Sequence, residues 1–204
     1  RHDSACFCIS PGSRSTPLAL AVARNYHANS IIFNDERAAA YYALGHARGS
    51  GRPAVLICTS GTSTANYLPA IVEASIEQIP MLVLTSDRPP ELRDTGANQS
   101  INQTFLFGTY VRWFFDPGCP SPEFKVEALL STIDHAIFKT SRPLPGPVHL
   151  NLPFREPFFE NDDNKRTSKI KNFVGKKPHV KNMKSRTILS HSGLKELLKN
   201  RPES

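Results

Sequence analysis

The chain has 204 residues, of which 39% are hydrophobic, and this is enough to bury the core of one ordinary globular domain. Since no apolar run approaches the ~20 residues that a transmembrane helix needs, we expect no membrane span. The formal net charge of +7 suggests a nucleic-acid partner, but residues 161–204 carry 12 Lys and Arg against 4 Asp and Glu, whereas residues 1–160 carry 13 against 14. The basic charge therefore belongs to the C-terminal segment. Lysine-rich linkers are usually just solvated, so we expect no nucleic-acid partner.

Short apolar runs alternate with longer helix-like stretches. In chain order we predict strand 5–10, helix 17–26, strand 30–34, helix 36–48, strand 54–59, helix 64–77, strand 81–86, helix 123–139 and strand 147–152. The strand candidates are unbroken apolar runs, as in strands buried on both faces of a parallel sheet. Thr16 and Ser121 are placed to cap the first and last helices, with Pro17 at the first helical position. This alternation predicts an α/β fold with a mainly parallel sheet.

Three features fall outside this rhythm. Residues 87–116 form a connection too long to be simple, and long structured connections tend to be functional. The composition of residues 159–204 is that of a basic linker, and an amphipathic stretch at 193–199 could begin another domain. Because the sequence begins with Arg1 rather than Met, we expect an N-terminal piece to be missing.

The four cysteines have no zinc-ligand spacing, so we expect no structural metal. Three of them, Cys6, Cys8 and Cys58, lie in apolar runs and are expected to be buried free thiols, which suits a reducing compartment.

Polar, turn-forming residues follow four of the predicted strands, and the carboxyl ends of parallel strands meet at one edge of a sheet, where ligands bind. The first turn carries Gly12 and Arg14 at the start of a helix, which suits an anion. A capped helix with a solvated arginine explains Arg14 equally well. Glu36 begins the second helix, where a plain capping role is favoured over that of a buried proton-exchanging acid.

Ser60 and Gly61 follow the third strand, and Arg88 follows the fourth. Pro89 and Pro90 stiffen the loop after Arg88, which helps to direct an arginine and the Asn98-Gln99 amides toward one ligand. The alanine-rich helix over residues 36–48 would let a partner chain come close, although a helix that faces the sheet has the same composition.

Five motifs carry a family resemblance. In chain order they are SPGSRSTPL (10–18), DER (35–37), TSGTSTAN (59–66), TSDRPPELRDTGANQ (85–99) and GPVHLNLPFREP (146–157). Together they resemble the N-terminal portion of the MenD family of thiamine-diphosphate-dependent 2-succinyl-5-enolpyruvyl-6-hydroxy-3-cyclohexene-1-carboxylate synthases. The resemblance implies that residues 1–158 form a PYR (aminopyrimidine-binding) domain with a three-layer α/β/α architecture.

The resemblance also implies a site. A glutamate at the position of Glu36 would hydrogen-bond the aminopyrimidine of thiamine diphosphate, and proton exchange there would generate the reactive carbon of the cofactor. Substrate contacts are implied for Ser13, Arg14, Arg88, Asn98 and Gln99. The substrates of the family are 2-oxoglutarate, which is decarboxylated, and isochorismate, to which the product is added. Both are dicarboxylates, which gives a physical reason for two arginines.

The family's diphosphate-binding domain carries a Gly-Asp-Gly metal motif, and no Gly-Asp pair occurs in this sequence. We therefore expect the groups that hold Mg²⁺ or Mn²⁺ and the diphosphate to come from that domain in another subunit of a homo-oligomer. The chain alone is then inactive, and its location is cytoplasmic, or organellar if a transit peptide preceded Arg1. The alternatives are a non-catalytic PYR-like module that binds a partner subunit through the alanine-rich helix and, well behind, a nucleic-acid-binding protein that uses the basic tail.

Overall fold

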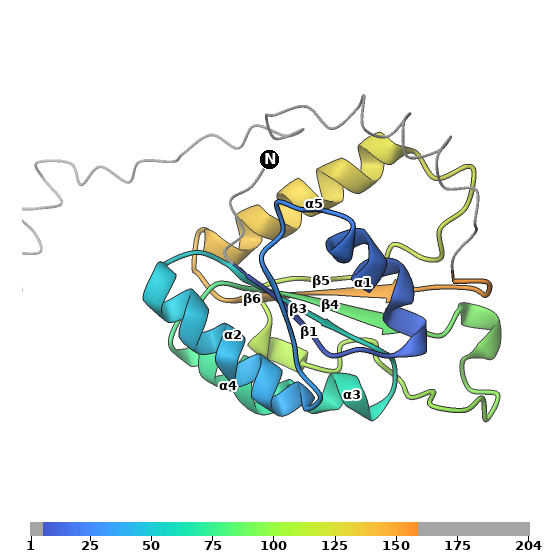
Figure 1. The fold of residues 1–204 in the computed structure, drawn as a ribbon, viewed down its shortest axis with the longest axis horizontal. Helices are drawn as coiled ribbons and strands as arrows, with labels where there is room; N and C mark the ends of the chain where they lie inside the picture. The colour runs from blue at the N-terminus through green and yellow to red at the C-terminus, as the bar shows by residue number, and fades with distance from the viewer. Residues whose placement is uncertain (1–5, 159–204) are drawn as a thin grey trace, which may run out of the picture.

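The computed structural model describes residues 6–158, which form a six-stranded sheet with helices on both faces (Figure 1). The strands are β1 (Phe7–Ile9), β2 (Ser30–Ile32), β3 (Ala54–Cys58), β4 (Met81–Asp87), β5 (Phe114–Phe115) and β6 (Pro147–Pro153). The helices are α1 (Thr16–Ala23), α2 (Glu36–Ser50), α3 (Thr62–Ala65), α4 (Leu68–Ile76) and α5 (Val126–Ser141). The strand order is β2-β1-β3-β4-β6-β5 and every neighbouring pair is parallel, which confirms the predicted fold class.

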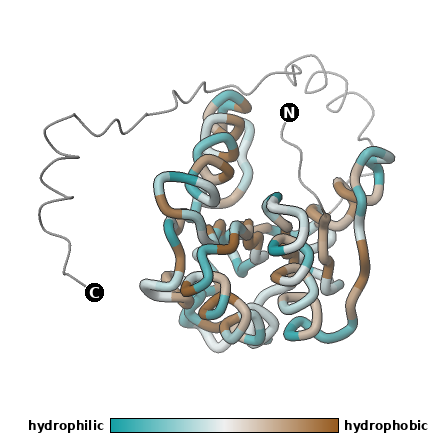
Figure 2. The backbone as a smooth tube through the Cα atoms, turned by 90° about the vertical axis from the view of Figure 1, so that its left-hand side faces the viewer, coloured by the Kyte–Doolittle hydropathy of each residue, from teal (hydrophilic) through white to brown (hydrophobic). Residues whose placement is uncertain are grey.

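Two apolar clusters hold the three layers together. On one face of the sheet, buried alanines of α2 and buried side chains of α4 pack against β1, β3 and β4. On the other face, Val22 of α1 and Ala136 of α5 pack against β3, β4 and β6. The helices carry both hydrophilic and hydrophobic stretches in Figure 2, as expected when one side of each meets the sheet.

Burial on both faces holds for the central strands only. Every residue of β3 is buried, and Cys6, Cys8 and Cys58 are buried free thiols as expected. Burial raises the pKa of the Cys58 thiol to about 12. The expectation is wrong for β2, because this strand lies at the edge of the sheet and Ser30 and Ile32 are exposed. A short apolar run does not distinguish an edge strand from a central one.

The helix predicted over residues 64–77 is instead two helices, α3 and α4. Pro69 stands at the second position of α4, where it has no N–H to give to the carbonyl of Ala65. A continuous helix would therefore lose that bond and bring the proline ring against the carbonyl. The break leaves Tyr67 between the helices, fully buried.

The predicted caps of the first and last helices are also wrong. Thr16 is the first residue of α1 rather than its cap, and the preceding Ser15 directs its hydroxyl to the carbonyl of Gly12 (2.9 Å). α5 begins at Val126, three residues later than expected, because the chain first makes a turn in which Phe124 N–H donates to Ser121 O (3.1 Å).

Residues 88–113 form an ordered excursion between β4 and β5. It contains 3-10 turns at Pro90–Leu92 and Gly108–Tyr110. Arg112 fastens its end by donating to Pro145 O (2.9 Å) and to Ser75 O (2.6 Å). The two residues of β5 are too few to give a strand signal in the sequence.

The basic linker over 159–204 and the amphipathic stretch at 193–199 lie outside the described residues. Between residues 6 and 158, no helix has the length and apolar content needed to cross a lipid bilayer.

Candidate functional site

The turn between β1 and α1 places Arg14 inside the protein, with only 5% of its surface exposed. The turn packs directly on the end of β3, since a Cβ atom added at Gly12 would lie 2.4 Å from Thr59 Cβ. This close approach requires glycine and fixes where the following residues begin. The interpretation of Arg14 as a solvated arginine is therefore wrong.

The segment that follows β6 supplies the partners of Arg14. Nη1 donates to Phe154 O (2.9 Å), Nη2 donates to Glu156 Oε1 (3.2 Å), and the guanidinium carbon lies 4.6 Å from the centroid of the Phe158 ring. Nε is buried and has no hydrogen-bond partner within residues 6–158. Arg14 is thus held in place with its Nε unused.

Glu36 is the first residue of α2, but it does not cap the helix. Asp35 is the cap, and its Oδ1 accepts from Ala38 N–H (2.8 Å). The half-buried Glu36 instead accepts from Ser63 Oγ at Oε1 (2.7 Å) and from Asn66 Nδ2 at Oε2 (3.2 Å). The favoured capping role is therefore wrong for Glu36, and its carboxylate is directed toward α3.

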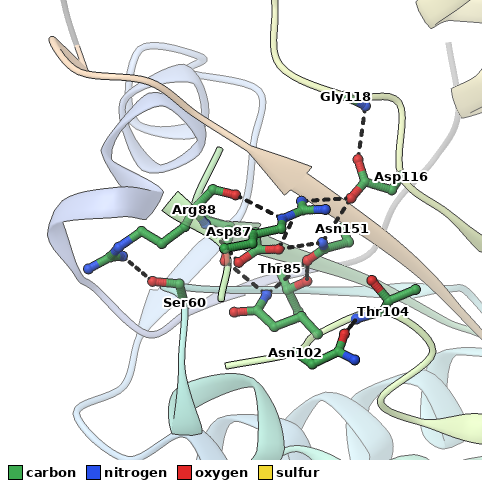
Figure 3. Close-up of polar contacts among 12 residues, drawn as sticks. Ser60, Thr85, Asp87, Arg88, Asn102, Thr104, Asp116, Gly118 and Asn151 are labelled. Carbon is green, nitrogen blue, oxygen red and sulfur yellow. Dashed lines mark hydrogen bonds and ion pairs between the residues drawn. The ribbon is translucent and has the colours of Figure 1, made fainter. Parts of the chain in front are cut away.

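Arg88 directly follows β4 and is 9% exposed. Its Nη1 donates to Ser60 Oγ and its Nη2 donates to Asn98 O (2.6 Å). Figure 3 shows the side chain extended toward Ser60. Burial, and then the positive charge of Arg14, lower the pKa of Arg88. The two arginines are therefore close enough to repel each other.

One turn, residues 60–63, leads from β3 into the first two residues of α3 and brings three of the predicted site residues together. Ser63 holds Glu36, Ser60 Oγ holds Arg88, and Gln99 Nε2 donates to Ser60 O (2.9 Å). Gln99 is otherwise exposed.

Ser13 and Asn98 are the two remaining predicted substrate contacts. Both are exposed, Ser13 on the first 3-10 turn next to Arg14, and Asn98 where its carbonyl meets Arg88. The six predicted residues thus lie in neighbouring loops and at the start of α2, at the carboxyl ends of the strands.

A buried polar cluster beneath these loops was not predicted. Asp87 and Asp116 both accept from Arg93 Nη2 (3.0 and 2.9 Å) and from Asn151 Nδ2 (2.8 and 3.1 Å), and Figure 3 shows the carboxylates converging on Asn151. Burial raises the pKa of Asp87, while the hydrogen bonds from Asn151 and from Arg88 N–H oppose the increase. The pairing of Arg93 with Asp116 could not be predicted, because the two residues are distant along the chain, and no local pattern directs Arg93 back to Asp87. The only available signal was that Asp87 directly follows one predicted strand and Asn151 lies in another.

Gln103 connects this cluster to the turn that holds Glu36 and Arg88. Its Nε2 donates to Asn151 Oδ1 (2.8 Å) and to Ser86 O (3.1 Å), and its Oε1 accepts from Gly61 N–H (2.9 Å). Gly61 has a φ of +85°, a conformation that glycine adopts without strain. The fully buried side-chain amide of Gln103 therefore determines the position of the turn at residues 60–63.

Residues 1–106 match the family described as "Thiamine pyrophosphate enzyme, N-terminal TPP binding domain". The chain belongs to this family. Its membership agrees with the three-layer fold and with the resemblance seen in the motifs.

Relatives of this TPP-binding domain bear the name 2-succinyl-5-enolpyruvyl-6-hydroxy-3-cyclohexene-1-carboxylate synthase. The protein of Chlorobium phaeobacteroides is 62% identical over 158 residues, which are 78% of this chain and 27% of the relative. The protein of Chlorobaculum tepidum is 59% identical over 160 residues (77% and 27%). That of Rubrobacter xylanophilus is 55% identical over 152 residues (74% and 26%). The chain spans about a quarter of the length of these curated relatives.

The residues of this TPP-binding domain fit the aminopyrimidine end of the cofactor. Each oxygen of the Glu36 carboxylate accepts one hydrogen bond, which leaves lone pairs for a further donor such as an aminopyrimidine ring. Residues 6–158 contain no group of three or more His, Cys, Asp or Glu arranged to hold a metal ion.

Proposed function

We propose that this chain is the N-terminal part of a thiamine-diphosphate-dependent transferase of the MenD type. The whole enzyme would decarboxylate 2-oxoglutarate and add the product to isochorismate in menaquinone or phylloquinone biosynthesis. The observation that carries the proposal is the turn at residues 60–63, which joins the Glu36 carboxylate to Arg88. The names of relatives that are more than half identical to the chain give further support.

Each predicted residue has a role that its surroundings suit. When bound, thiamine diphosphate supplies the carbon nucleophile that attacks a 2-oxo acid. Glu36 exchanges a proton with the aminopyrimidine ring through a carboxylate that Ser63 and Asn66 hold in one orientation. Arg14 and Arg88 pair with substrate carboxylates, where charge-assisted hydrogen bonds are strong.

The exposed Ser13, Asn98 and Gln99 complete the substrate contacts in this proposal. In the whole enzyme, the diphosphate and its Mg²⁺ or Mn²⁺ would be held by the diphosphate-binding domain of another subunit of a homo-oligomer, and these 204 residues alone would have no activity. The site of action is the cytoplasm, or an organelle if the chain is imported. The named relatives above are bacterial, which favours the cytoplasm.

The proposal is tested by mixing the chain with the diphosphate domain of a relative and measuring release of CO₂ from 2-oxoglutarate. Glu36→Gln keeps the shape of the side chain and one acceptor oxygen but cannot exchange the proton, so we expect kcat to fall by about 10²- to 10⁴-fold. Glu91→Gln is the matched control, since Glu91 is exposed and paired with Arg155 away from the turn. Full activity of Glu36→Gln would refute the role of Glu36.

A non-catalytic module that binds a partner subunit is the second candidate, but its original basis is weakened. The alanines of α2, Ala39, Ala40, Ala43 and Ala47, are buried against the sheet and are not free to meet a partner. What favours a partner instead is the exposure of Tyr41 and Tyr42 on the same helix. Stable co-elution with a diphosphate domain in size-exclusion chromatography, without turnover, would support this candidate over the first.

A further inference from the structure

The chain leaves β6 across the buried Arg14. Within this segment Glu156 Oε1 accepts from Arg14 Nη2 at 3.2 Å, although the Glu156 side chain is 69% exposed and that of Arg14 only 6%. An exposed carboxylate thus forms an ion pair with a buried guanidinium group. The pair differs from an ordinary surface ion pair in that only one partner is solvated.

The carboxylate of Glu156 acts on both arginines of the candidate site. Arg14 and Arg88 are each at least nine-tenths buried, and Arg14 lowers the pKa of Arg88. The negative charges of Asp87 and then of Glu156 oppose that effect, although the pKa of Arg88 stays lowered. Two buried guanidinium groups close to each other repel, so a carboxylate beside them relieves the repulsion.

Glu156 satisfies Arg14 incompletely. Only one of its oxygens binds the guanidinium, whereas a carboxylate and an arginine can form two parallel hydrogen bonds. The buried Nε of Arg14 still has no partner among residues 6–158. A free carboxylate could use this donor, so an incoming ligand has something to gain by displacing Glu156.

We propose that Glu156 is an internal carboxylate that occupies the anion site of Arg14 and Arg88 and must be displaced by a carboxylate of the substrate. This inference rests on the proposed function, because it takes the two arginines as the substrate's binding groups. Glu156 would lower the affinity for dicarboxylates, and it would keep the buried guanidinium groups paired when no substrate is bound.

The test measures the binding of succinate, an unreactive dicarboxylate, to the whole chain by calorimetry. Glu156→Gln retains an oxygen that accepts from Arg14 but removes the charge, so a weaker internal competitor remains. We expect the variant to bind succinate about three- to tenfold more tightly than the unmodified chain, with a smaller gain at high salt concentration. Glu91→Gln removes a carboxylate from an exposed ion pair with Arg155 and should leave the affinity unchanged.

Equal or weaker binding by Glu156→Gln would overturn the inference, as would the absence of succinate binding in every protein tested. Circular dichroism checks that both variants are folded, and because Glu156 and Glu91 are exposed we expect no loss of structure. The proposed function is judged separately, by the effect of Glu36→Gln on turnover. Failure of the inference can thus be told apart from failure of that function.

Discussion

Thr85, His149 and Asn151 are buried residues whose hydrogen bonds determine which group donates and which nitrogen of His149 carries the proton. Asn151 uses its Nδ2 on the two aspartates, so its Oδ1 accepts, and Thr85 gives its only hydroxyl proton to that oxygen (2.9 Å). His149 Nε2, 2.7 Å from Thr85 Oγ1, must then be the donor. Its Nδ1 is buried without a partner within residues 6–158, so a second proton there would have no acceptor and the imidazole is neutral.

This arrangement predicts acid sensitivity. Burial lowers the pKa of His149 to about 3, whereas an unfolded chain has its ordinary value near 6.5. Between these values the unfolded chain takes up a proton that the folded chain refuses. Stability is therefore lost as the pH falls through this window, by up to about 1.4 kcal/mol per pH unit. We expect the difference in unfolding free energy between the unmodified chain and His149→Gln to shrink by roughly 2 kcal/mol from about pH 6.5 to about pH 4.5.

Urea denaturation at several pH values measures this difference. The glutamine of this variant is not titratable, and its amide can still donate to Thr85. The control is His135→Gln, which removes an imidazole from the exposed surface and keeps the contact between Thr85 and His149. If the difference between the unmodified chain and His149→Gln is the same at both pH values, the account of His149 is wrong.

At the scale of elements, the turn between β1 and α1 depends on its contact with the end of β3. In Gly12→Ala the new methyl group would lie 2.4 Å from Thr59 Cβ, and neither atom can move without moving the backbone. We expect a loss of about 1–3 kcal/mol in unfolding free energy. Because the same turn carries Arg14, succinate binding should weaken as well.

Gly45→Ala is the matched control for this substitution. Gly45 lies inside α2, and a Cβ added there meets no heavy atom within 4 Å. The change should therefore stabilise the chain by up to about 1 kcal/mol through helix propensity alone. Thermal unfolding of the two variants checks both signs, and a Gly12→Ala variant as stable as the unmodified chain would contradict the close contact.

Elements with long, regular patterns could be predicted from the sequence, and those set by single contacts could not. The runs that became β3, β4 and β6 are mostly apolar because both of their faces are covered. The break at Pro69 was readable from the proline, but the alternation of apolar residues around it favoured one helix. The edge position of β2 depends on which strand pairs with β1, and a local pattern does not contain that information.

The contacts that join the candidate site across the whole molecule could not be predicted from local patterns either. Glu36 and Arg88 could be placed at one edge of the sheet because both follow strands. Their shared turn, the Gln103 bond beneath it and the Glu156 contact join residues 27 to 142 positions apart. Such contacts follow from the packed sheet and have no signature in the local sequence.

The layer of α2, α4 and residues 105–110 bears several exposed large apolar side chains. Ile76 is 68% exposed and Phe105 is 62% exposed, and Tyr41 and Tyr110 are exposed in the same layer. Exposed apolar groups gathered in one layer favour a protein partner. If this layer meets the diphosphate domain, Ile76→Asp should raise the dissociation constant for that domain at least about tenfold. The interface would lose the isoleucine side chain that it buries, and it would have to desolvate a carboxylate instead.

Analytical ultracentrifugation of the chain with the diphosphate domain of a relative measures this constant. Tyr26→Asp is the control, because Tyr26 follows α1 on the opposite face of the sheet and is 90% exposed. A charge at Tyr26 should leave association intact. If Ile76→Asp and Tyr26→Asp bind the diphosphate domain equally well, that domain binds a face other than that of α4. Glu36 would then have to meet the cofactor from the side of α1.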